Sequence, residues 1–192
     1  SGVAAIEGSI LGAMLSEAFD WNNEENIVSI ASHAAAIAGQ VYDHYRPIEH
    51  DQTISMAYMA GTGHLLGMGV IELVGNVDDY RTAPLVSASL GLAGAISGPY
   101  LAKSAQFNTN DAALVGVGTG ISIWNAWMLA SMAYSADQSA YFNQYGRTEG
   151  LGMTLQSLGQ AASVGLASKL DIDKSQSLFV GSMGVWGAYY GL

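Results

Sequence analysis

The segment "LFVGSMGVWGAYYGL", residues 178–192, carries glycines at 181, 184, 187 and 191 among large apolar residues. Residues at i, i+3, i+4 and i+7 share one face of an α-helix, so these four glycines form a face without side chains. Each glycine costs about 0.5–1 kcal/mol relative to alanine in a helix. Close approach of a neighbouring helix backbone recovers that cost, and the spacing therefore predicts a glycine zipper.

The same spacing recurs earlier in the chain. Gly91, Gly94 and Gly98 form a second such face, and Gly116 with Gly120 forms a shorter one. Faces of small residues four positions apart let helices pack closely, especially in lipid. The predicted helix-packing residues are Gly91, Gly94, Gly98, Gly116, Gly120, Gly181, Gly184, Gly187 and Gly191.

Long uncharged runs separate the few charged residues. The longest, between Asp111 and Asp137, contains 25 residues, and the run between Arg81 and Lys103 contains 21. As helices, runs of this length span about 30 Å. Charges return in short intervals of the form apolar, Asp/Glu/Asn, any residue, Asp/Asn, as in Phe107-Asn108-Thr109-Asn110 and Leu170-Asp171-Ile172-Asp173.

These intervals are typical of helix starts, because an Asp or Asn side chain accepts hydrogen bonds from the first backbone N–H groups of a helix. Asp173 and Gln176 have the spacing of a capping box, as do Asn22 and Glu25. Starts near 22, 51, 82 and 110 lie about 30 residues apart, which indicates a degenerate repeat of one helix and one turn.

The sequence therefore predicts one all-α helical-repeat domain over residues 1–192. About seven antiparallel, glycine-zippered helices of about 20 residues are expected in helical-hairpin repeats. We expect Pro99 to kink or end the fourth helix and residues 135–148 to form the longest connection. The expected helices cover residues 3–18, 23–44, 52–74, 83–102, 111–134, 149–168 and 174–191.

An antiparallel β-barrel is the alternative. Over 115–123, Val and Ile alternate with Gly and Ser, and period two is a strand signal. However, Leu114, Val117 and Ile121 also step by three or four residues. Because the runs are long, rich in Ala, Met and Leu, and introduced by capping residues, we favour helices.

Composition excludes several classes of function. The chain has 16 acidic and only 6 basic residues, a net charge of -10, so it lacks the basic patch that nucleic acid requires. It contains no cysteine, which removes thiolate metal sites and cysteine nucleophiles. We expect no cofactor: "GTGHLLGMG", residues 61–69, has neither the context of a dinucleotide fingerprint nor the lysine of a phosphate loop.

Two environments fit the uncharged runs. Charged residues are 11% of the chain, and several tyrosines lie near run ends, as in the interfacial belt of a membrane protein. Yet the runs contain many Ser, Thr, Gln and Asn residues, and the few Lys and Arg residues favour no side. A soluble Ala/Gly-rich core therefore stays open beside membrane embedding.

Candidate chemistry is sparse. The cluster "YDHYRPIEHD", residues 42–51, offers His44, Glu49, His50 and Asp51 as weak metal ligands, but they straddle a turn and have no recognised ligand spacing, so we predict no metal site. The remaining titratable groups inside apolar runs are His33, His64, Glu7, Glu17 and Glu72.

We interpret His33 and His64 as buried side chains satisfied by a neighbouring helix. No spacing in the sequence pairs the glutamates with each other for acid–base work. If the helices lie in lipid, each histidine becomes a functional candidate. The sequence predicts no catalytic residue.

The pattern of a Gly-rich helix, a short acidic turn and a further Gly-rich helix ending in "WGAYYG" resembles helical-repeat segments of large bacterial envelope proteins. The resemblance covers about two thirds of the chain and implies no catalytic residue. It favours a non-enzymatic structural or scaffolding protein, in or beside a membrane of the bacterial envelope, that associates with copies of itself or with a larger protein assembly. A membrane channel or transport component and a soluble helical binding module are the alternatives.

Overall fold

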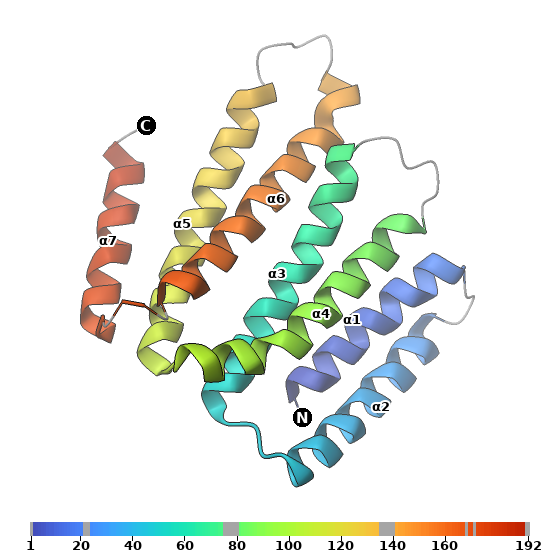
Figure 1. The fold of residues 1–192 in the computed structure, drawn as a ribbon. Helices are drawn as coiled ribbons and strands as arrows, with labels where there is room; N and C mark the ends of the chain where they lie inside the picture. The colour runs from blue at the N-terminus through green and yellow to red at the C-terminus, as the bar shows by residue number, and fades with distance from the viewer. Residues whose placement is uncertain are drawn as a thin grey trace.

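The computed structural model describes residues 2–20, 24–74, 81–134, 141–167, 169–170 and 172–190. This part of the chain contains seven α-helices and no strand (Figure 1). The all-α prediction is confirmed, and the barrel alternative is not supported. The helices are α1 (Gly2–Phe19), α2 (Glu24–Tyr45), α3 (His50–Val74), α4 (Thr82–Ala105), α5 (Thr109–Tyr134), α6 (Tyr141–Ala167) and α7 (Lys174–Tyr190).

The alternating segment 115–123 lies inside α5, where a step of three or four residues brings side chains to one face. Accordingly, Val117 and Ile121 lie opposite two glycines of α7. The period of two thus arises because Gly and Ser residues separate the Val and Ile residues. The secondary structure is set by the longer uncharged run that contains this segment.

Two helix boundaries differ from the prediction for a common reason. Helix α6 begins at Tyr141, within the expected connection 135–148, and α4 continues through Pro99 to Ala105. Once a helix is nucleated, each added residue gains one hydrogen bond, so a helix extends through weak formers. Residues 135–140, in the middle of the expected connection, lie outside the described residues.

The starts of α5 and α7 use side-chain caps, although not always at the predicted residue, whereas the N-cap of α4, Arg81, makes no side-chain capping hydrogen bond. The capping box at Asp173 is confirmed: the Gln176 N–H donates to Asp173 Oδ1 at 2.8 Å, and the Asp173 N–H donates to Gln176 Oε1 at 3.0 Å. At α5 the cap is Asn108 rather than Asn110, because Asn108 Oδ1 accepts the N–H groups of Asn110 and Asp111. The Asn22 cap lies outside the described residues.

The start of α7 should depend on pH. The Ser175 hydroxyl, 2.6 Å from Asp173 Oδ1, and the Gln176 N–H together hold the pKa of Asp173 below its ordinary value of 3.8. A lowered pKa stabilises the folded helix start above that ordinary value, and this contribution is lost as pH falls through the folded pKa. We expect backbone chemical shifts of residues 174–178 to move toward unfolded values in strong acid. Asp173→Asn keeps a capping oxygen without a titrating group, so its acid-dependent change should disappear; an unchanged response would contradict this account.

The described helices form three hairpins plus a last helix. Helix α1 packs on α2, α3 on α4, and α5 on α6, while α1–α4 and α3–α6 contacts join the hairpins. The neighbours therefore run α2, α1, α4, α3, α6, α5, α7, with α2 and α7 at opposite edges (Figure 1). Short turns predict that sequential helices are antiparallel neighbours, but in the described part α2 does not contact α3, nor α4 α5, nor α6 α7.

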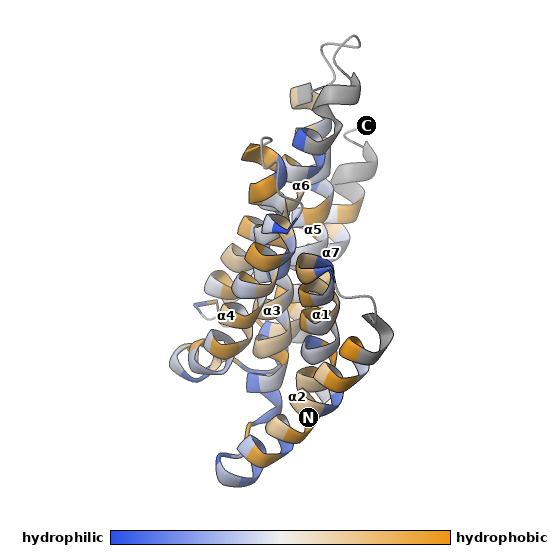
Figure 2. Ribbon diagram, turned by 90° about the vertical axis from the view of Figure 1, so that its right-hand side faces the viewer, coloured by the Kyte–Doolittle hydropathy of each residue, from blue (hydrophilic) through white to orange (hydrophobic). Residues whose placement is uncertain are grey.

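Most side chains in the interior are small. Among the described residues, eight of the eleven buried hydrophobic residues are alanines, and the others are Phe107, Val115 and Val164. Large apolar side chains point outward instead, among them Ile30, Ile96 and Val185 at 59–71% exposure. Figure 2 shows apolar segments along the helices and hydrophilic ones at several helix ends.

Within the part of the chain that the structure describes, four helices are long and apolar enough to cross a membrane. They comprise Gly2–Phe19, His50–Val74, Thr82–Ala105 and Asn110–Ala133. Only 11–39% of the most apolar part of each is buried within the protein. The surface that remains is apolar, which suggests membrane association.

Candidate functional site

The most polar contact between helices in the described interior joins α1, α3 and α4. Glu7 comes from the second turn of α1, His64 from the middle of α3, and Ser87 from the second turn of α4. Each is buried, with 8%, 7% and 0% of its surface exposed, respectively. Buried carboxylate and imidazole groups are uncommon unless they are paired, so this cluster is the first candidate for function.

Glycines make the room that this cluster occupies. A Cβ atom at Gly91 would overlap the His64 ring, so the ring lies directly on the α4 backbone. Gly63, directly before His64, and Gly67, three residues after it, face the α4 backbone at Leu90 and Ser87. The close approach of α3 and α4 therefore fixes the imidazole between two backbones, with its outer nitrogen toward α1.

Two hydrogen bonds hold the imidazole. His64 Nε2 lies 3.0 Å from Glu7 Oε2, and His64 Nδ1 lies 3.4 Å from Ser87 Oγ. The Ser87 hydroxyl also donates to the backbone carbonyl of His64 at 3.0 Å. A serine, a histidine and a glutamate thus form a continuous hydrogen-bonded row across three helices.

The row resembles a nucleophilic triad in composition but not in access. A serine nucleophile must reach a substrate carbonyl beside free oxyanion donors. Ser87 has no exposed surface, and its hydroxyl hydrogen is directed to a carbonyl within the protein. The arrangement is suited to holding or moving a proton, which needs only hydrogen-bonded neighbours.

The sequence prediction for this cluster was correct for one residue and incomplete for the others. His64 is buried and satisfied by neighbouring helices, as expected, whereas His33 is exposed and lies 2.7 Å from the carbonyl of Ser29 in its own helix. The pairing of Glu7 with His64 was missed because 57 residues separate them. One signal was available: each is the only Asp, Glu, His, Lys or Arg residue in its otherwise uncharged run.

Further polar contacts tie the hairpins together. Thr62 Oγ1 donates to Gln160 Oε1 at 3.1 Å between α3 and α6, and Ser55 Oγ donates to the Gly98 carbonyl at 2.9 Å between α3 and α4. The Trp127 indole N–H donates to Gln156 Oε1 at 3.2 Å between α5 and α6. These contacts account for polar residues that made the runs resemble weak membrane spans.

The predicted packing glycines have different surroundings. Gly94 and Gly98 face the backbone of α3 at Met59 and Met56, and Gly91 faces the His64 ring. Gly181 and Gly184 face side chains of α5 rather than backbone, contrary to the expectation, since Val117 and Ile121 fill the space. Gly116 touches only the Tyr58 hydroxyl, at 3.4 Å from an ideal Cβ, and Gly120 faces open space. The surroundings of Gly187 and Gly191 lie outside the described residues.

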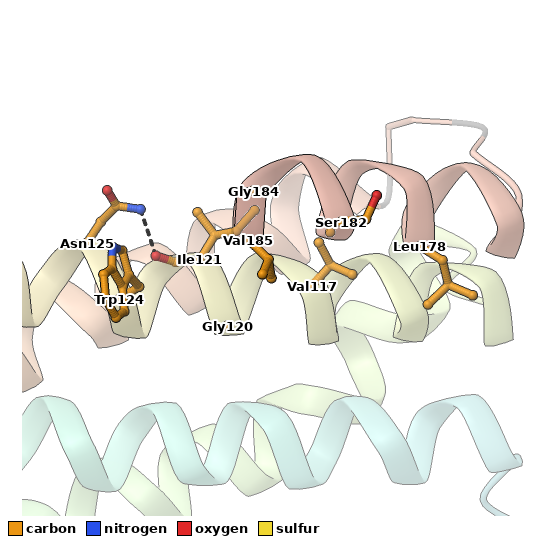
Figure 3. Close-up of a pocket in the computed structure, with 10 residues that line it drawn as sticks. Val117, Gly120, Ile121, Trp124, Asn125, Leu178, Ser182, Gly184 and Val185 are labelled. Carbon is orange, nitrogen blue, oxygen red and sulfur yellow. Dashed lines mark hydrogen bonds between the residues drawn. The ribbon is translucent and has the colours of Figure 1, made fainter. Parts of the chain in front are cut away.

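The side chains opposite α7 border an apolar groove of about 600 Å³ between α5 and α7 (Figure 3). Val117, Ile121, Trp124, Leu178 and Val185 line it. Its polar side chains are already bonded within their own helices: Asn125 donates to the Ile121 carbonyl at 2.8 Å and Ser182 to the Phe179 carbonyl. The groove therefore offers apolar surface and little hydrogen-bonding specificity.

The structure does not assemble the weak metal candidates His44, Glu49, His50 and Asp51. The described residues contain no group of three or more His, Asp or Glu side chains that could hold an ion. The Glu49 N–H instead donates to Gln52 Oε1 at 3.2 Å at the start of α3, and the His44 ring packs edge-on against Tyr45. This segment serves the turn between α2 and α3.

Comparison of the chain with protein-family models, with curated proteins and with solved structures gives no match.

Proposed function

We propose that this protein is a non-enzymatic scaffold of the bacterial envelope, embedded in a membrane and packed against copies of itself or a larger assembly. The observation that supports the proposal is that the buried side chains are mostly small and many large apolar side chains are exposed, whereas large apolar side chains are ordinarily buried. Apart from Phe107, Val115 and Val164, the buried hydrophobic residues of the described part are alanines, while many Leu, Ile and Val side chains are exposed, several of them on helices long enough to span a membrane. In lipid, helices associate through close packing and hydrogen bonds rather than through burial of large apolar groups.

Interhelical contacts of this chain match that mode of association. The α3 and α4 backbones meet at Gly63, Gly94 and Gly98, and hydroxyl groups such as that of Ser55 bond across the interface. The edge helices α2 and α7 each contact one described helix and expose apolar side chains on the remaining surface. These edges are the surfaces that we assign to self-association or to a larger partner.

A single charge on the outer face tests the membrane assignment. Leu92 lies near the middle of α4 and is 45% exposed. Leu92→Lys places a charge at the centre of a span, where insertion costs about 2.5–3.5 kcal/mol. We expect the variant to leave the membrane fraction or to be degraded, while the wild-type chain resists alkaline extraction and is released by detergent.

The matched control is Tyr45→Lys, which adds the same charge at the exposed end of α2. There the ammonium group reaches water, so the variant should fractionate like the wild type. Loss of both variants from the membrane, or recovery of the wild-type chain as a detergent-free monomer, would contradict the proposal.

A channel or transport component is the second candidate function, and the buried Glu7–His64 pair favours it. Ionisable side chains inside membrane spans commonly mark ion pathways or proton relays. Purified protein in lipid vesicles distinguishes the two candidates, because a scaffold leaves an imposed proton gradient intact. Dissipation that Glu7→Gln abolishes would favour transport.

A further inference from the structure

The hydrogen bonds around His64 restrict where its protons are. The Ser87 hydroxyl has one hydrogen, and it is directed to the His64 carbonyl at 3.0 Å. Ser87 Oγ can therefore only accept from His64 Nδ1, which lies 3.4 Å away. A hydrogen bond across this contact therefore places a hydrogen on Nδ1.

The contact on the other side of the ring requires a second hydrogen. His64 Nε2 and Glu7 Oε2 are 3.0 Å apart, a hydrogen-bond distance. With Nδ1 protonated, the shared hydrogen makes either an imidazolium beside a carboxylate or a neutral imidazole beside a carboxylic acid. Both arrangements have no net charge.

Burial favours this neutral pair over its alternative. A neutral imidazole with its hydrogen on Nε2, donating to a carboxylate, would leave one uncompensated negative charge between three helices. An isolated charge is strongly disfavoured in such an environment. It would also leave Nδ1 with a hydroxyl whose hydrogen points elsewhere.

We propose that Glu7 and His64 form a proton-binding site, in which one proton is shared between Oε2 and Nε2 while α1 is docked on α3 and α4. The α1–α2 hairpin contacts the other described helices only through α1, and this pair lies in that contact. When α1 withdraws, water solvates both groups. A free carboxyl and a free imidazole at pH 7.5 hold less than one proton between them on average, so the proton passes to water or buffer.

Among the described residues, the charged groups nearest to the pair along its own helices are Glu17 on α1, Glu72 on α3 and Arg81 at the N-cap of α4. At 1.5 Å per residue they lie about 15, 12 and 9 Å along the helix axes from Glu7, His64 and Ser87, respectively. Arg81 is exposed, so water screens its charge. On α2, which packs on α1, His33 is exposed, and on α6, which packs on α3, the inward-facing polar residues Ser157, Gln160 and Thr154 carry no charge. The proton shared by Glu7 and His64 is therefore what neutralises the site.

Nitrogen-15 magnetic resonance of the full chain at pH 7.5, labelled at its histidines, tests the proposal. We expect His64 Nδ1 to be protonated, and the second proton to appear on Nε2 or as a carboxylic acid band in the infrared spectrum that Glu7→Gln removes. His33, which is exposed, serves as the internal reference for a solvated imidazole. An unprotonated Nδ1, or a bare Nε2 beside a Glu7 carboxylate, would overturn the proposal.

One variant tests the protonation of Nδ1, and others assign the histidine resonances. Ser87→Ala removes the acceptor of the Nδ1 hydrogen, so the Nδ1-protonated fraction of His64 should fall; an unchanged fraction would overturn the assignment. Resonances are assigned by His64→Gln or, if that chain does not fold, by exclusion with His33→Gln, His44→Gln and His50→Gln, which are exposed. The protonation of His64 can be measured in buffer or in detergent. The proton-binding proposal can therefore be tested even if the membrane scaffold proposal fails.

Discussion

Gly63→Ala is expected to destabilise the protein by about 1–3 kcal/mol or more, whereas Gly61→Ala should stabilise it by about 0.5–1 kcal/mol. The two glycines lie two residues apart in α3, on opposite sides of the helix. A Cβ atom at Gly63 would collide with the Leu90 carbonyl of α4, so the two helix backbones must separate. A Cβ atom at Gly61 meets nothing within 4 Å.

The comparison isolates packing from helix propensity, because both substitutions bring the same gain in propensity. Reversible unfolding followed by circular dichroism, in whichever of buffer or detergent keeps the chain dispersed, gives the two free energies. Equal effects at the two positions would show that α3 and α4 do not meet as described. Gly94→Ala should behave like Gly63→Ala, since its Cβ would collide with the Met59 carbonyl.

Removal of one member of the buried pair should have the largest effect outside the glycine contacts. His64→Leu leaves Glu7 without the partner now 3.0 Å away, and breaking a buried pair in this way costs about 3–5 kcal/mol. Replacing both partners by apolar residues of similar volume is often neutral or stabilising. We therefore expect the double variant Glu7→Met/His64→Leu to recover most of the lost stability.

A double-mutant cycle measures this coupling directly. The single variants, the double variant and the wild type are unfolded under the same conditions, and the interaction free energy follows from the four values. Additive effects would mean that the two side chains do not interact. The cycle has a matched control in Glu17→Met, which removes a carboxylate from the end of the same helix without touching His64.

The helices could be predicted from the sequence because the relevant signals are local. Capping residues and uncharged runs lie within one helix and one turn, and Asp173 with Gln176 forms the predicted capping box. The extension of α6 to Tyr141 could not be predicted from residues 141–148, because a helix that is already nucleated extends through weak helix formers.

Helix pairing was harder to predict than helix position. Glycine spacing identifies a bare face but not what covers it: Gly98 meets the backbone of α3, whereas Gly184 meets the Ile121 side chain. The Glu7–His64 contact depends on which hairpins are neighbours, and no local pattern encodes that choice. Short turns suggested that α2 and α3 would pack together, yet α1 and α4 join their hairpins instead.

The small size of the buried side chains affects the thermodynamics of unfolding. The heat-capacity change of unfolding follows the apolar area newly exposed to solvent. In this protein many of the large apolar side chains are already exposed, and the alanines and serines that make up most of the buried residues contribute little when the helices separate. The heat-capacity increment per residue should therefore fall below the usual value of about 12–15 cal/mol/K. A flatter stability curve follows, in which folding free energy varies little between cold and warm conditions.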